Sequence, residues 1–365
     1  MYQNDKRIVI TLDAGGTNLV FSAMRGCEFI IEPISKPSNS HDLDLCLKTI
    51  VDGFKEVIGK LPQLPVAISF AFPGPADYEH GIIGGYLPNF PSFREGVALG
   101  PMLESEFGIP VFINNDGDLF ALGEAMDGML PEVNARIKAL GSNKVYKNLL
   151  GYTFGTGFGI GSVINGQLNR GNNSCIETFC LPNKLLPGII AEEGVAVRAV
   201  KRVYAEVSGD KDHQFEPYDI CKIADGKIEG DKEAAKEAWR RLGESAGNAM
   251  AIAATLTDSL IVIGGGMTGA HKYFMPALLA ELRSTLKTLT GDNVGLIQAE
   301  VFNLDDEEEL RQFARGAARP LKVYGTEETV TYDPMKCTGV AISRLGASRA
   351  ISIGAYVFAL TNLDK

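Results

Sequence analysis

The sequence has few histidines and no long apolar run, and both shortages narrow its possible functions. Only four histidines occur in 365 residues, and none lies in a glycine-rich or strand-end cluster. No segment approaches the roughly 18 apolar residues of a membrane helix. The polar N-terminus passes directly into a strand-like run, without the apolar core of a signal peptide. We therefore expect a cytoplasmic protein that does not contact a membrane.

Positive charge is also scarce. Lys and Arg number 35 against 45 Asp and Glu, which gives a formal net charge of −10 at pH 7. A nucleic-acid-binding surface would show a basic stripe, so we expect no nucleic-acid partner. The six cysteines are scattered and only Cys175 and Cys180 lie close together, which suits a reducing compartment. Without further Cys or His partners these two make no tetrahedral zinc site, and we predict that both are buried thiols.

The composition is that of a globular protein large enough for two domains. Hydrophobic residues make up 45% and charged residues 22%, which excludes a disordered chain. Strand-like and helix-like patterns alternate, as in α/β architecture. The patterns predict helices at 41–58, 100–108, 117–126, 188–206, 232–256 and 346–360, and strands at 65–72, 110–114, 148–154, 158–164 and 258–264.

Two distant segments share one pattern of strand, glycine-threonine turn and strand. They are IVITLDAGGTNLVFSAM at 8–24 and LLGYTFGTGFGIGSVING at 149–166, which suggests one structural unit used twice in a duplicated fold. Glycines let the backbone approach a ligand, and their amides can point at phosphate oxygens. Two such turns facing each other would hold a polyphosphate. The chain has no Gly-x-x-x-x-Gly-Lys-Ser/Thr motif, so it would not bind phosphate through the usual P-loop.

Asp13 stands at the end of the first strand, directly before the turn. A carboxylate beside a phosphate site is repulsive unless a divalent cation lies between them. Mg²⁺ prefers oxygen ligands and keeps several waters, so one Asp can hold it through its hydration shell. The alternative is that Asp13 is a turn residue making local backbone hydrogen bonds.

A second carboxylate, Asp116, falls where a predicted strand passes into a helix in INNDGDLFALGE. Catalytic groups often occupy this place in open α/β sheets. Phosphoryl transfer needs mainly positioning and charge stabilisation, plus one group that accepts the hydroxyl proton. Asp116 fits that role. The alternative is that Asn115 or Asp116 is simply a helix N-cap.

Taken in order, these motifs resemble those of the ROK family of sugar kinases and related repressors. Residues 13–17 match its D-x-G-G-T motif, and PGPAD with LPNFPSF matches its Pro-Gly-Pro and Pro-Asn loops. Residues 115–117 with ALGEA match its N-D-A/G-N…A-L-G-E segment, and residues 155–159 its second phosphate motif. IVIGGGM and SRAISIGAY follow in family order. The resemblance implies a two-domain, actin-like ATPase fold, a duplicated ribonuclease H-like fold with an interdomain cleft that closes around sugar.

The resemblance also implies roles for individual residues in ATP-dependent phosphorylation of a hexose or N-acetylhexosamine. Asp116 would be the general base and Asp13 would position hydrated Mg²⁺. The family commonly forms homodimers. The implied nucleotide and phosphate residues are Asp13, Gly15, Gly16, Thr17, Asn18, Gly155, Thr156, Gly157, Gly264, Gly265 and Gly266, and the implied sugar residues are Gly74, Asn89, Asn115, Asp116, Glu177 and Glu193.

The sugar pocket is where the chain departs from the family pattern. Many members carry E-x-G-H and then a cysteine-rich zinc motif ending in a sugar-binding Glu, whereas this chain has GNNSCIETFCLPNKLLPGIIAEEGVAVRAV. Glu177 can replace the first Glu, and Glu193 the last; the alternative for Glu193 is a solvated helix-face acid. A catalytically degenerate protein that binds sugar or nucleotide in a regulatory role is therefore the alternative function. We expect no ROK repressor, because the first motif begins at Asp13, without room for a preceding DNA-binding domain.

The domain prediction follows from the same reading. We expect a smaller domain of residues 1–114 closed by the helix at 345–365, and a larger domain of residues 115–344. The segment EETVTYDPMKCTGVAISRL lies beyond the usual core of the family. We interpret it as a strand pair with a role in nucleotide or subunit contacts.

Overall fold

A computed structural model of the chain describes residues 2–74, 76–210, 212 and 214–365, so Pro75 of the Pro-Gly-Pro motif lies outside the described residues. The chain divides into two compact units. Unit 1 contains Met1–Gly128, Gly161–Ile176 and Leu345–Lys365, and unit 2 contains Met129–Ile160 and Glu177–Arg344. The predicted boundary after residue 114 differs from this division, because helix α3 (Asp116–Met126) belongs to unit 1.

The sheet of unit 1 combines an antiparallel hairpin with parallel strands. β1 (Val9–Ala14) pairs antiparallel with β2 (Asn18–Arg25), and β3 (Glu28–Phe29) and β4 (Ile34–Pro37) extend β2. On its other side β1 pairs in parallel with β5 (Ala67–Ala71), which pairs in parallel with β8 (Val111–Asn114). The order β3-β2-β1-β5-β8 brings the C-terminal ends of β1, β5 and β8 to one edge.

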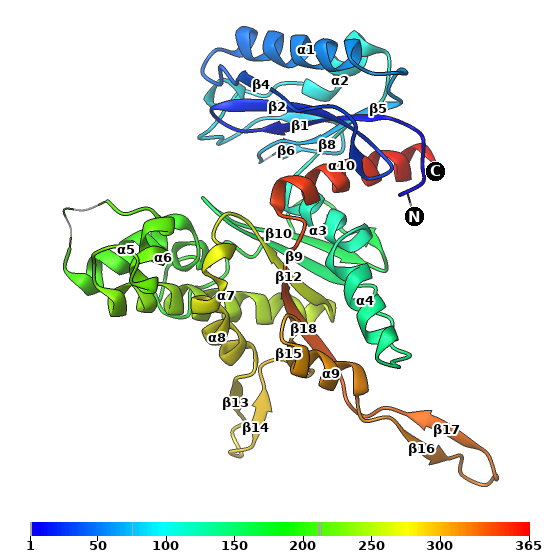
Figure 1. The fold of residues 1–365 in the computed structure, drawn as a ribbon, viewed down its shortest axis with the longest axis vertical. Helices are drawn as coiled ribbons and strands as arrows, with labels where there is room; N and C mark the ends of the chain where they lie inside the picture. The colour runs from blue at the N-terminus through cyan, green and yellow to red at the C-terminus, as the bar shows by residue number, and fades with distance from the viewer. Residues whose placement is uncertain (1, 75, 211, 213) are drawn as a thin grey trace. The chain divides into compact units, whose positions relative to one another are not determined.

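Helices cover both faces of this sheet. Figure 1 shows α1 (Leu43–Gly59) and α2 (Leu99–Phe107) on one face and α10 (Ala347–Leu363) on the other. The helix predicted at 41–58 is confirmed, and its buried face repeats at helical spacing through Cys46, Ile50, Phe54 and Val57. Short elements complete the unit: β6 (Ala76–Asp77), β7 (Ile82–Ile83), η1 (Pro91–Phe93) and β11 (Gln167–Leu168).

Two glycines let α3 and α10 touch backbone to backbone. A Cβ on Gly123 of α3 would overlap the Ala350 carbonyl oxygen of α10, and a Cβ on Gly354 of α10 would overlap the Leu119 carbonyl oxygen. The reciprocal contact places α3 firmly in unit 1. The predicted boundary missed it because the glycine pairing lies 231 residues apart in the sequence (123 to 354).

A second sheet repeats the plan of the first, and it lies in unit 2 except for residues 161–168, which belong to unit 1. Its order is β11-β10-β9-β12-β18-β15, in which β9 (Leu149–Phe154) and β10 (Phe158–Ile164) form the hairpin. Parallel strands β12 (Leu260–Gly264), β18 (Cys337–Ile342) and β15 (Glu300–Asn303) follow. The same succession of hairpin and parallel strands in both sheets confirms the duplication that the two turn motifs suggested.

The helices of unit 2 gather around a second core. Figure 1 shows α5 (Val197–Ser208), α6 (Pro217–Asp225), α7 (Lys232–Thr257) and α8 (His271–Leu282) grouped on one side of the sheet. The fully buried Trp239 of α7 lies in this core. The helix predicted at 188–206 begins later, because residues 191–194 form only the 3-10 turn η2 (Ala191–Gly194). The remaining helical elements are α4 (Met129–Ala139), α9 (Glu307–Arg315) and η3 (Thr268–Ala270).

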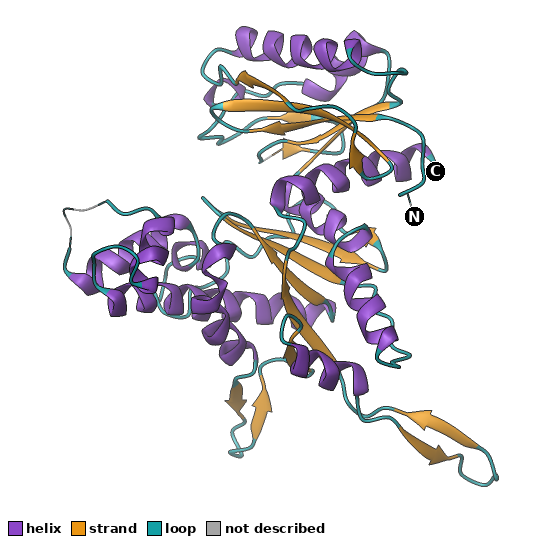
Figure 2. Ribbon diagram, viewed as in Figure 1, coloured by secondary structure: helices purple, strands orange, loops and turns teal. Residues whose placement is uncertain are grey.

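Two hairpins of unit 2 stand outside its sheet. β13 (Thr285–Lys287) pairs with β14 (Asn293–Gly295), and β16 (Arg319–Lys322) pairs with β17 (Thr329–Tyr332). Figure 2 shows both as isolated two-stranded ribbons. The segment after residue 326 does contain two strands, but they do not pair with each other as expected. β17 pairs with β16, and β18 joins the main sheet. None of the helices in the described part of the chain is long and apolar enough to span a bilayer.

We predict that Gly354→Ala lowers the free energy of unfolding by roughly 1–3 kcal/mol, because the added methyl group forces α3 and α10 apart. Denaturant unfolding monitored by circular dichroism measures the change. Gly59→Ala is the matched control, since a Cβ at this exposed helical position meets nothing within 4 Å. Equal stabilities of the two variants would contradict the proposed role of the contact.

Candidate active site

The first glycine-threonine turn lies in unit 1 and is closed by its own backbone. Gly15 N donates to Asn18 O at 3.0 Å, so this amide is used within the hairpin. The carbonyl oxygen of Gly16 accepts hydrogen bonds from Ser38 Oγ at 2.5 Å and Ser40 Oγ at 3.2 Å. These bonds fix the peptide after Gly16. Exposed Thr17 and Asn18 follow it.

The turn also contacts a residue predicted for the sugar site. A Cβ built on Gly16 would lie 3.0 Å from Asn89 Cβ, so the turn packs closely against Asn89. Gly74, from the Pro-Gly-Pro loop after β5, is similarly confined by the Tyr78 hydroxyl, which donates to Phe72 O at 2.9 Å. The structure thus brings Asn89 to the phosphate turn and holds Gly74 in a braced loop.

Asp13 and Asp116 lie at the C-terminal edge of the unit 1 sheet. Asp13 is in β1, where it pairs with Val20 and Ala71, and its Oδ2 accepts a long hydrogen bond of 3.5 Å from Ser348 Oγ. Surrounding protein atoms withhold water from the carboxylate and raise the pKa of Asp13 above its ordinary value, while Ser348 lowers it. Within the described residues, no cationic side chain contacts this carboxylate.

The sequence left open whether Asn115 or Asp116 serves only as the N-cap of the helix. Asn115 is the N-cap of α3, and its Oδ1 accepts a hydrogen bond from Gly117 N at 2.8 Å. Asp116 is the first residue of the helix and is exposed, and its Oδ1 shares the same donor at 2.9 Å. The cap interpretation therefore holds for Asn115, while the Asp116 carboxylate keeps a second oxygen free of this interaction.

The surroundings of Asp116 raise the pKa of its carboxyl group. Removal of water around the carboxylate raises its pKa most, the Gly117 amide lowers it, and the charge on Asp13 raises it again. A carboxylic acid whose pKa moves toward neutral pH is better suited to accept a proton from an alcohol. The electrostatic influence of Asp13 also shows that the two carboxylates lie near each other.

A third acid, Asp118, lies in the first turn of α3, where only 8% of it is exposed. Burial raises the pKa of Asp118 to about 7, the Arg170 guanidinium lowers it, and the charge on Asp116 raises it. Arg170 donates to Asn114 Oδ1 at 3.1 Å and lies over the Phe358 ring at 5.4 Å. Sequence reasoning missed this group, since the family pattern carries Asn at the position of Asp118.

The second glycine-threonine turn lies in unit 2 and is held by the start of α5. Gly155 N donates to Gly157 O at 3.1 Å, which closes the turn much as Gly15 closes the first. Val197 N donates to Gly155 O at 2.9 Å, and the Arg198 guanidinium donates to Thr156 O at 3.1 Å. Two of the three turn carbonyls are thus fixed by one helix terminus.

Glu192 completes this support and is the acid that contacts the turn. Its Oε2 accepts from Phe158 N at 3.0 Å, and its Oε1 pairs with Arg198 at 2.7 Å. A Cβ on Gly157 would lie 2.9 Å from Glu192 Oε2. Glu193 instead pairs with Arg198 at 2.7 Å, which lowers the pKa of Glu193. Neither Glu192 nor Arg198 could be recognised from the sequence as a support of the turn. Both come next to it only because η2 and the start of α5 fold against the hairpin.

The third glycine cluster ends β12 in unit 2. Gly264 is the last residue of the strand, and Gly265 has a φ of 97° and packs so tightly on the Phe154 backbone that a Cβ would overlap the Phe154 carbonyl oxygen. A Cβ on Gly266 would meet nothing within 4 Å. The cluster therefore combines one structural glycine with one that leaves open space beside the backbone.

The altered segment at 171–194 forms loops in place of a metal-binding motif. Cys175 and Cys180 are both exposed, so the prediction that they are buried thiols is wrong. They lie in a loop segment without helix or strand to cover them. Glu177 is half-buried, and its charge is among the causes that raise the pKa of Tyr152, which places it near that ring in unit 2. Among the described residues, no group of three His, Cys, Asp or Glu side chains is arranged to hold a metal.

These features define the class of protein. Two α/β units, each built on a hairpin and parallel strands with a glycine-threonine turn, form the two-domain actin-like ATPase fold. The sequence matches the ROK family over residues 9–178 and 186–304. The chain belongs to this family, and the resemblance drawn from its motifs is confirmed.

Known proteins of both functional kinds are similar to the chain. A crystal structure of glucokinase from Parabacteroides distasonis shares 56% identity over 99% of both chains, with a TM-score of 0.91. Glucokinase from Halalkalibacterium halodurans is 27% identical over 290 residues, 72% of this chain and 82% of that protein. The xylose repressor from Bacillus spizizenii is 28% identical over 135 residues, 36% of this chain. The chain spans only 31% of the length of that repressor.

We predict that stability falls as the pH rises through about 7, and that Asp118→Asn removes this slope. Folding raises the pKa of Asp118, so the folded state keeps a proton that the unfolded state loses above its ordinary pKa of 3.8. The contribution is fully present below that value and is lost as pH passes about 7. At pH 8 the variant should gain up to about 4 kcal/mol relative to the parent, at 1.36 kcal/mol per pKa unit.

Denaturant unfolding at pH 5, 6, 7 and 8 measures this difference. Asp44→Asn, at an exposed position in the first turn of α1, is the control and should follow the parent at every pH. A stability difference between Asp118→Asn and the parent that stays constant from pH 5 to 8 would show that Asp118 does not titrate in this range.

Proposed function

We propose that the protein is an ATP-dependent sugar kinase that transfers the γ-phosphate to a hydroxyl of a hexose or N-acetylhexosamine. The observation that carries the proposal is Asp116, an exposed carboxylate on the first turn of α3 whose pKa is raised by its surroundings and by the nearby Asp13. The similarity to glucokinases supports it, and glucose is the first substrate to test.

In this mechanism Asp116 accepts the proton of the attacking sugar hydroxyl. The hydroxyl oxygen forms a bond to the γ-phosphorus as the bond to the β,γ-bridging oxygen of ATP breaks, and ADP leaves with the electron pair. The raised pKa makes Asp116 a better proton acceptor than an ordinary aspartate. Asn115 holds the first turn of the helix and so orients this carboxylate.

Asp13 fits the magnesium role that the motif implies. Neighbouring protein atoms raise the pKa of Asp13, and within the described residues its carboxylate accepts one long side-chain hydrogen bond, from Ser348. A hydrated divalent cation would supply the missing compensation and, when bound, would neutralise charge on the transferring phosphate. We therefore propose ATP and Mg²⁺ as the required small molecules.

The two turns would hold the phosphates through the residues that their backbone geometry leaves available. Because the Gly15 and Gly155 amides close the turns, we assign them to shaping the loops. Gly16, Thr17, Asn18, Thr156 and Gly157 are the proposed phosphate contacts. Gly264, Gly265 and Gly266 are proposed for the adenosine side, with the open space at Gly266 as support.

The sugar contacts are proposed on both units. Asn89 and Gly74 adjoin the first turn or the loop beside it, and Asn115 adjoins Asp116. Glu177 and Glu193 are the proposed contacts from unit 2. Their side chains suit a sugar, because carboxylates and amides can bind adjacent hydroxyls. We also propose a cytoplasmic homodimer with neither nucleic acid nor membrane as a partner.

A regulatory protein without turnover is the second candidate. The altered loop at 171–194 and the similarity to xylose repressors favour it. A coupled assay of ADP release over a panel of hexoses and N-acetylhexosamines distinguishes the two. Stimulation by one sugar supports the kinase, whereas normal nucleotide binding without any stimulation would favour the regulatory role.

We predict that Asp116→Asn lowers kcat by about 10²–10⁴-fold, since the amide cannot accept the hydroxyl proton. The coupled assay measures kcat, and calorimetric titration with ATP checks that nucleotide binding persists. Asp44→Asn serves as the matched control on an exposed helix start and should keep full activity. A variant at Asp116 that retains activity would exclude this residue as the base.

We further predict that Glu192→Ala raises the KM for ATP roughly tenfold, as loss of one hydrogen bond to a charged group would. Removal of the side chain frees Phe158 N and leaves Arg198 without one of its partners, so the second turn loses its support. Glu206→Ala, which removes an exposed acid from the same helix that carries Arg198, is the control. Unchanged KM with a lower kcat would argue for a direct role in the reaction.

A further inference from the structure

The two projecting hairpins of unit 2 share an unusual feature, an apolar face that is open to solvent. We define the β13–β14 arm as residues 285–295 and the β16–β17 arm as residues 319–332. Figure 1 shows both arms extending from the same end of unit 2. An isolated two-stranded hairpin is at best marginally stable in water, so two such arms suggest surfaces that are covered in solution.

The strand pairing of the β16–β17 arm gives it one mainly apolar face and one polar face. Leu321 lies opposite Val330 and Arg319 opposite Tyr332, so these four side chains share one face. The Arg319 guanidinium lies 5.8 Å from the centre of the Tyr332 ring, in agreement with this pairing. The other face alternates to Pro320, Thr331, Lys322 and Thr329. Leu321, Val330 and Tyr332 remain 43%, 52% and 42% exposed.

The β13–β14 arm repeats the arrangement on a smaller scale. Leu286 lies opposite Val294 in the register, and both are more than half exposed. Leu289, in the loop between the strands, is fully exposed. Each arm therefore carries an aliphatic cross-strand pair on an open face.

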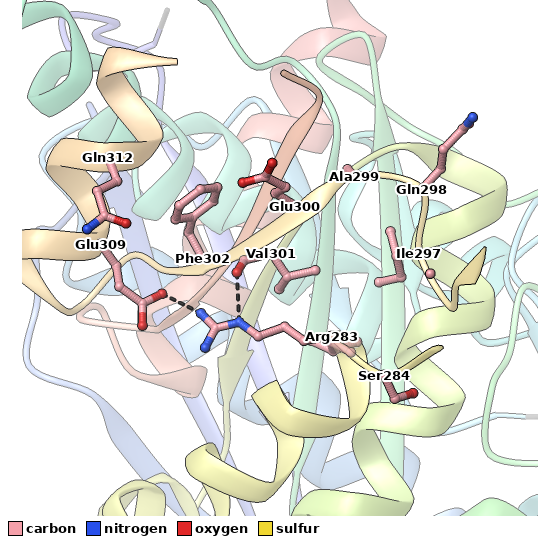
Figure 3. Close-up of a pocket in the computed structure, with 12 residues that line it drawn as sticks. Arg283, Ser284, Ile297, Gln298, Ala299, Glu300, Val301, Phe302, Glu309 and Gln312 are labelled. Carbon is pink, nitrogen blue, oxygen red and sulfur yellow. Dashed lines mark hydrogen bonds and ion pairs between the residues drawn. The ribbon is translucent and has the colours of Figure 1, made fainter. Parts of the chain in front are cut away.

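A groove lies beside the root of the β13–β14 arm, and we call it the β15 groove. It has a volume of about 640 Å³ and is lined from the end of α8, the end of the β13–β14 arm, β15 and α9. Figure 3 shows Ile297, Val301 and Phe302 around it, together with Arg283 and Glu309. The lining thus combines apolar side chains with the Arg283–Glu309 ion pair.

The edge of β15 in this groove is not available for strand addition. Arg283 Nε donates to Val301 O at 2.9 Å, Arg283 pairs with Glu309, and Glu309 Oε2 accepts from Asn303 N at 2.7 Å. Side chains therefore occupy the backbone groups with which an incoming strand would pair. A partner must bind this groove through side-chain packing.

Charge identifies the kind of partner that fits. The β16–β17 arm balances Arg319 and Lys322 with Glu327 and Glu328, and the β13–β14 arm balances one Lys with one Asp. Both arms are neutral in a chain of net charge −10. Neutral arms let two copies of an acidic chain approach there with the least repulsion.

We propose that the β16–β17 arm of each subunit packs its apolar face into the β15 groove of a second copy of this chain, and that this reciprocal contact forms the homodimer. One molecule carries both the arm and the groove, so a two-fold axis makes two equal contacts and closes the assembly. Each subunit would contribute the 14 residues of its β16–β17 arm and the 12 residues that line its groove, which lies within the roughly 20–30 residues a side of a standard interface. The inference rests on the proposed homodimer but not on kinase activity.

Sedimentation velocity over a range of protein concentrations tests the contact. We expect a dimer for the parent and an at least tenfold weaker dimer for an arm variant, Leu321→Asp with Val330→Asp. A groove variant, Ala299→Arg, should weaken the dimer similarly by filling the lined space. Leu64→Asp, at a 79% exposed leucine of unit 1, is the control and should remain dimeric. Thermal unfolding of all variants checks that they fold.

Mixing the arm variant with the groove variant provides a second, sharper test. The mixed dimer contains one contact between an intact arm and an intact groove, so mixing should restore dimers that neither variant forms alone. A monomeric parent would overturn both the homodimer and this surface. A dimeric parent whose arm and groove variants dimerise equally well would overturn this surface while leaving the homodimer in place.

Discussion

The backbone contact between α3 and α10 is the constraint on which the candidate active site depends. Gly123 and Gly354 remove the side chains that would separate the helices, and the first turn of α3 consequently stays fixed beside the ends of β1 and β8. Asp116 begins α3, and Ser348, near the start of α10, reaches Asp13. One pair of helices thus positions both carboxylates. The site residues are far apart in sequence because the C-terminal helix supplies half of this support.

The two phosphate turns achieve the same shape by different means. In unit 1 the serine hydroxyls of Ser38 and Ser40 hold the Gly16 carbonyl. In unit 2 the start of α5 and the Glu192–Arg198 pair hold the turn. Duplication therefore kept the hairpin and its glycine-threonine turn, while the supporting groups diverged.

The sequence predicted most of the fold because periodicity and strand-turn chemistry are local. The amphipathic face of α1, the glycine-threonine hairpins and the long α7 follow from patterns within single segments. The features it missed depend on contacts between distant segments, namely the α3–α10 packing, Arg170 beside Asp118 and Glu192 on the second turn. The exposed Cys175 and Cys180 were misjudged for a related reason: burial depends on whether another element covers a loop, which composition does not reveal.

The neighbouring carboxylates Asp13 and Asp116 have a consequence for the order of events at the site. Neighbouring protein atoms raise the pKa of each, and the charge on Asp13 raises the pKa of Asp116 further. A cation on Asp13 would weaken this repulsion and lower the proton affinity of Asp116, so a bound metal would shift the base toward its ionised form. The charged form is the one that accepts a proton. Asp13 and Asp116 therefore impose two opposing effects on the base: the charge on Asp13 strengthens its affinity for a proton, and a cation held by Asp13 would favour its ionised form.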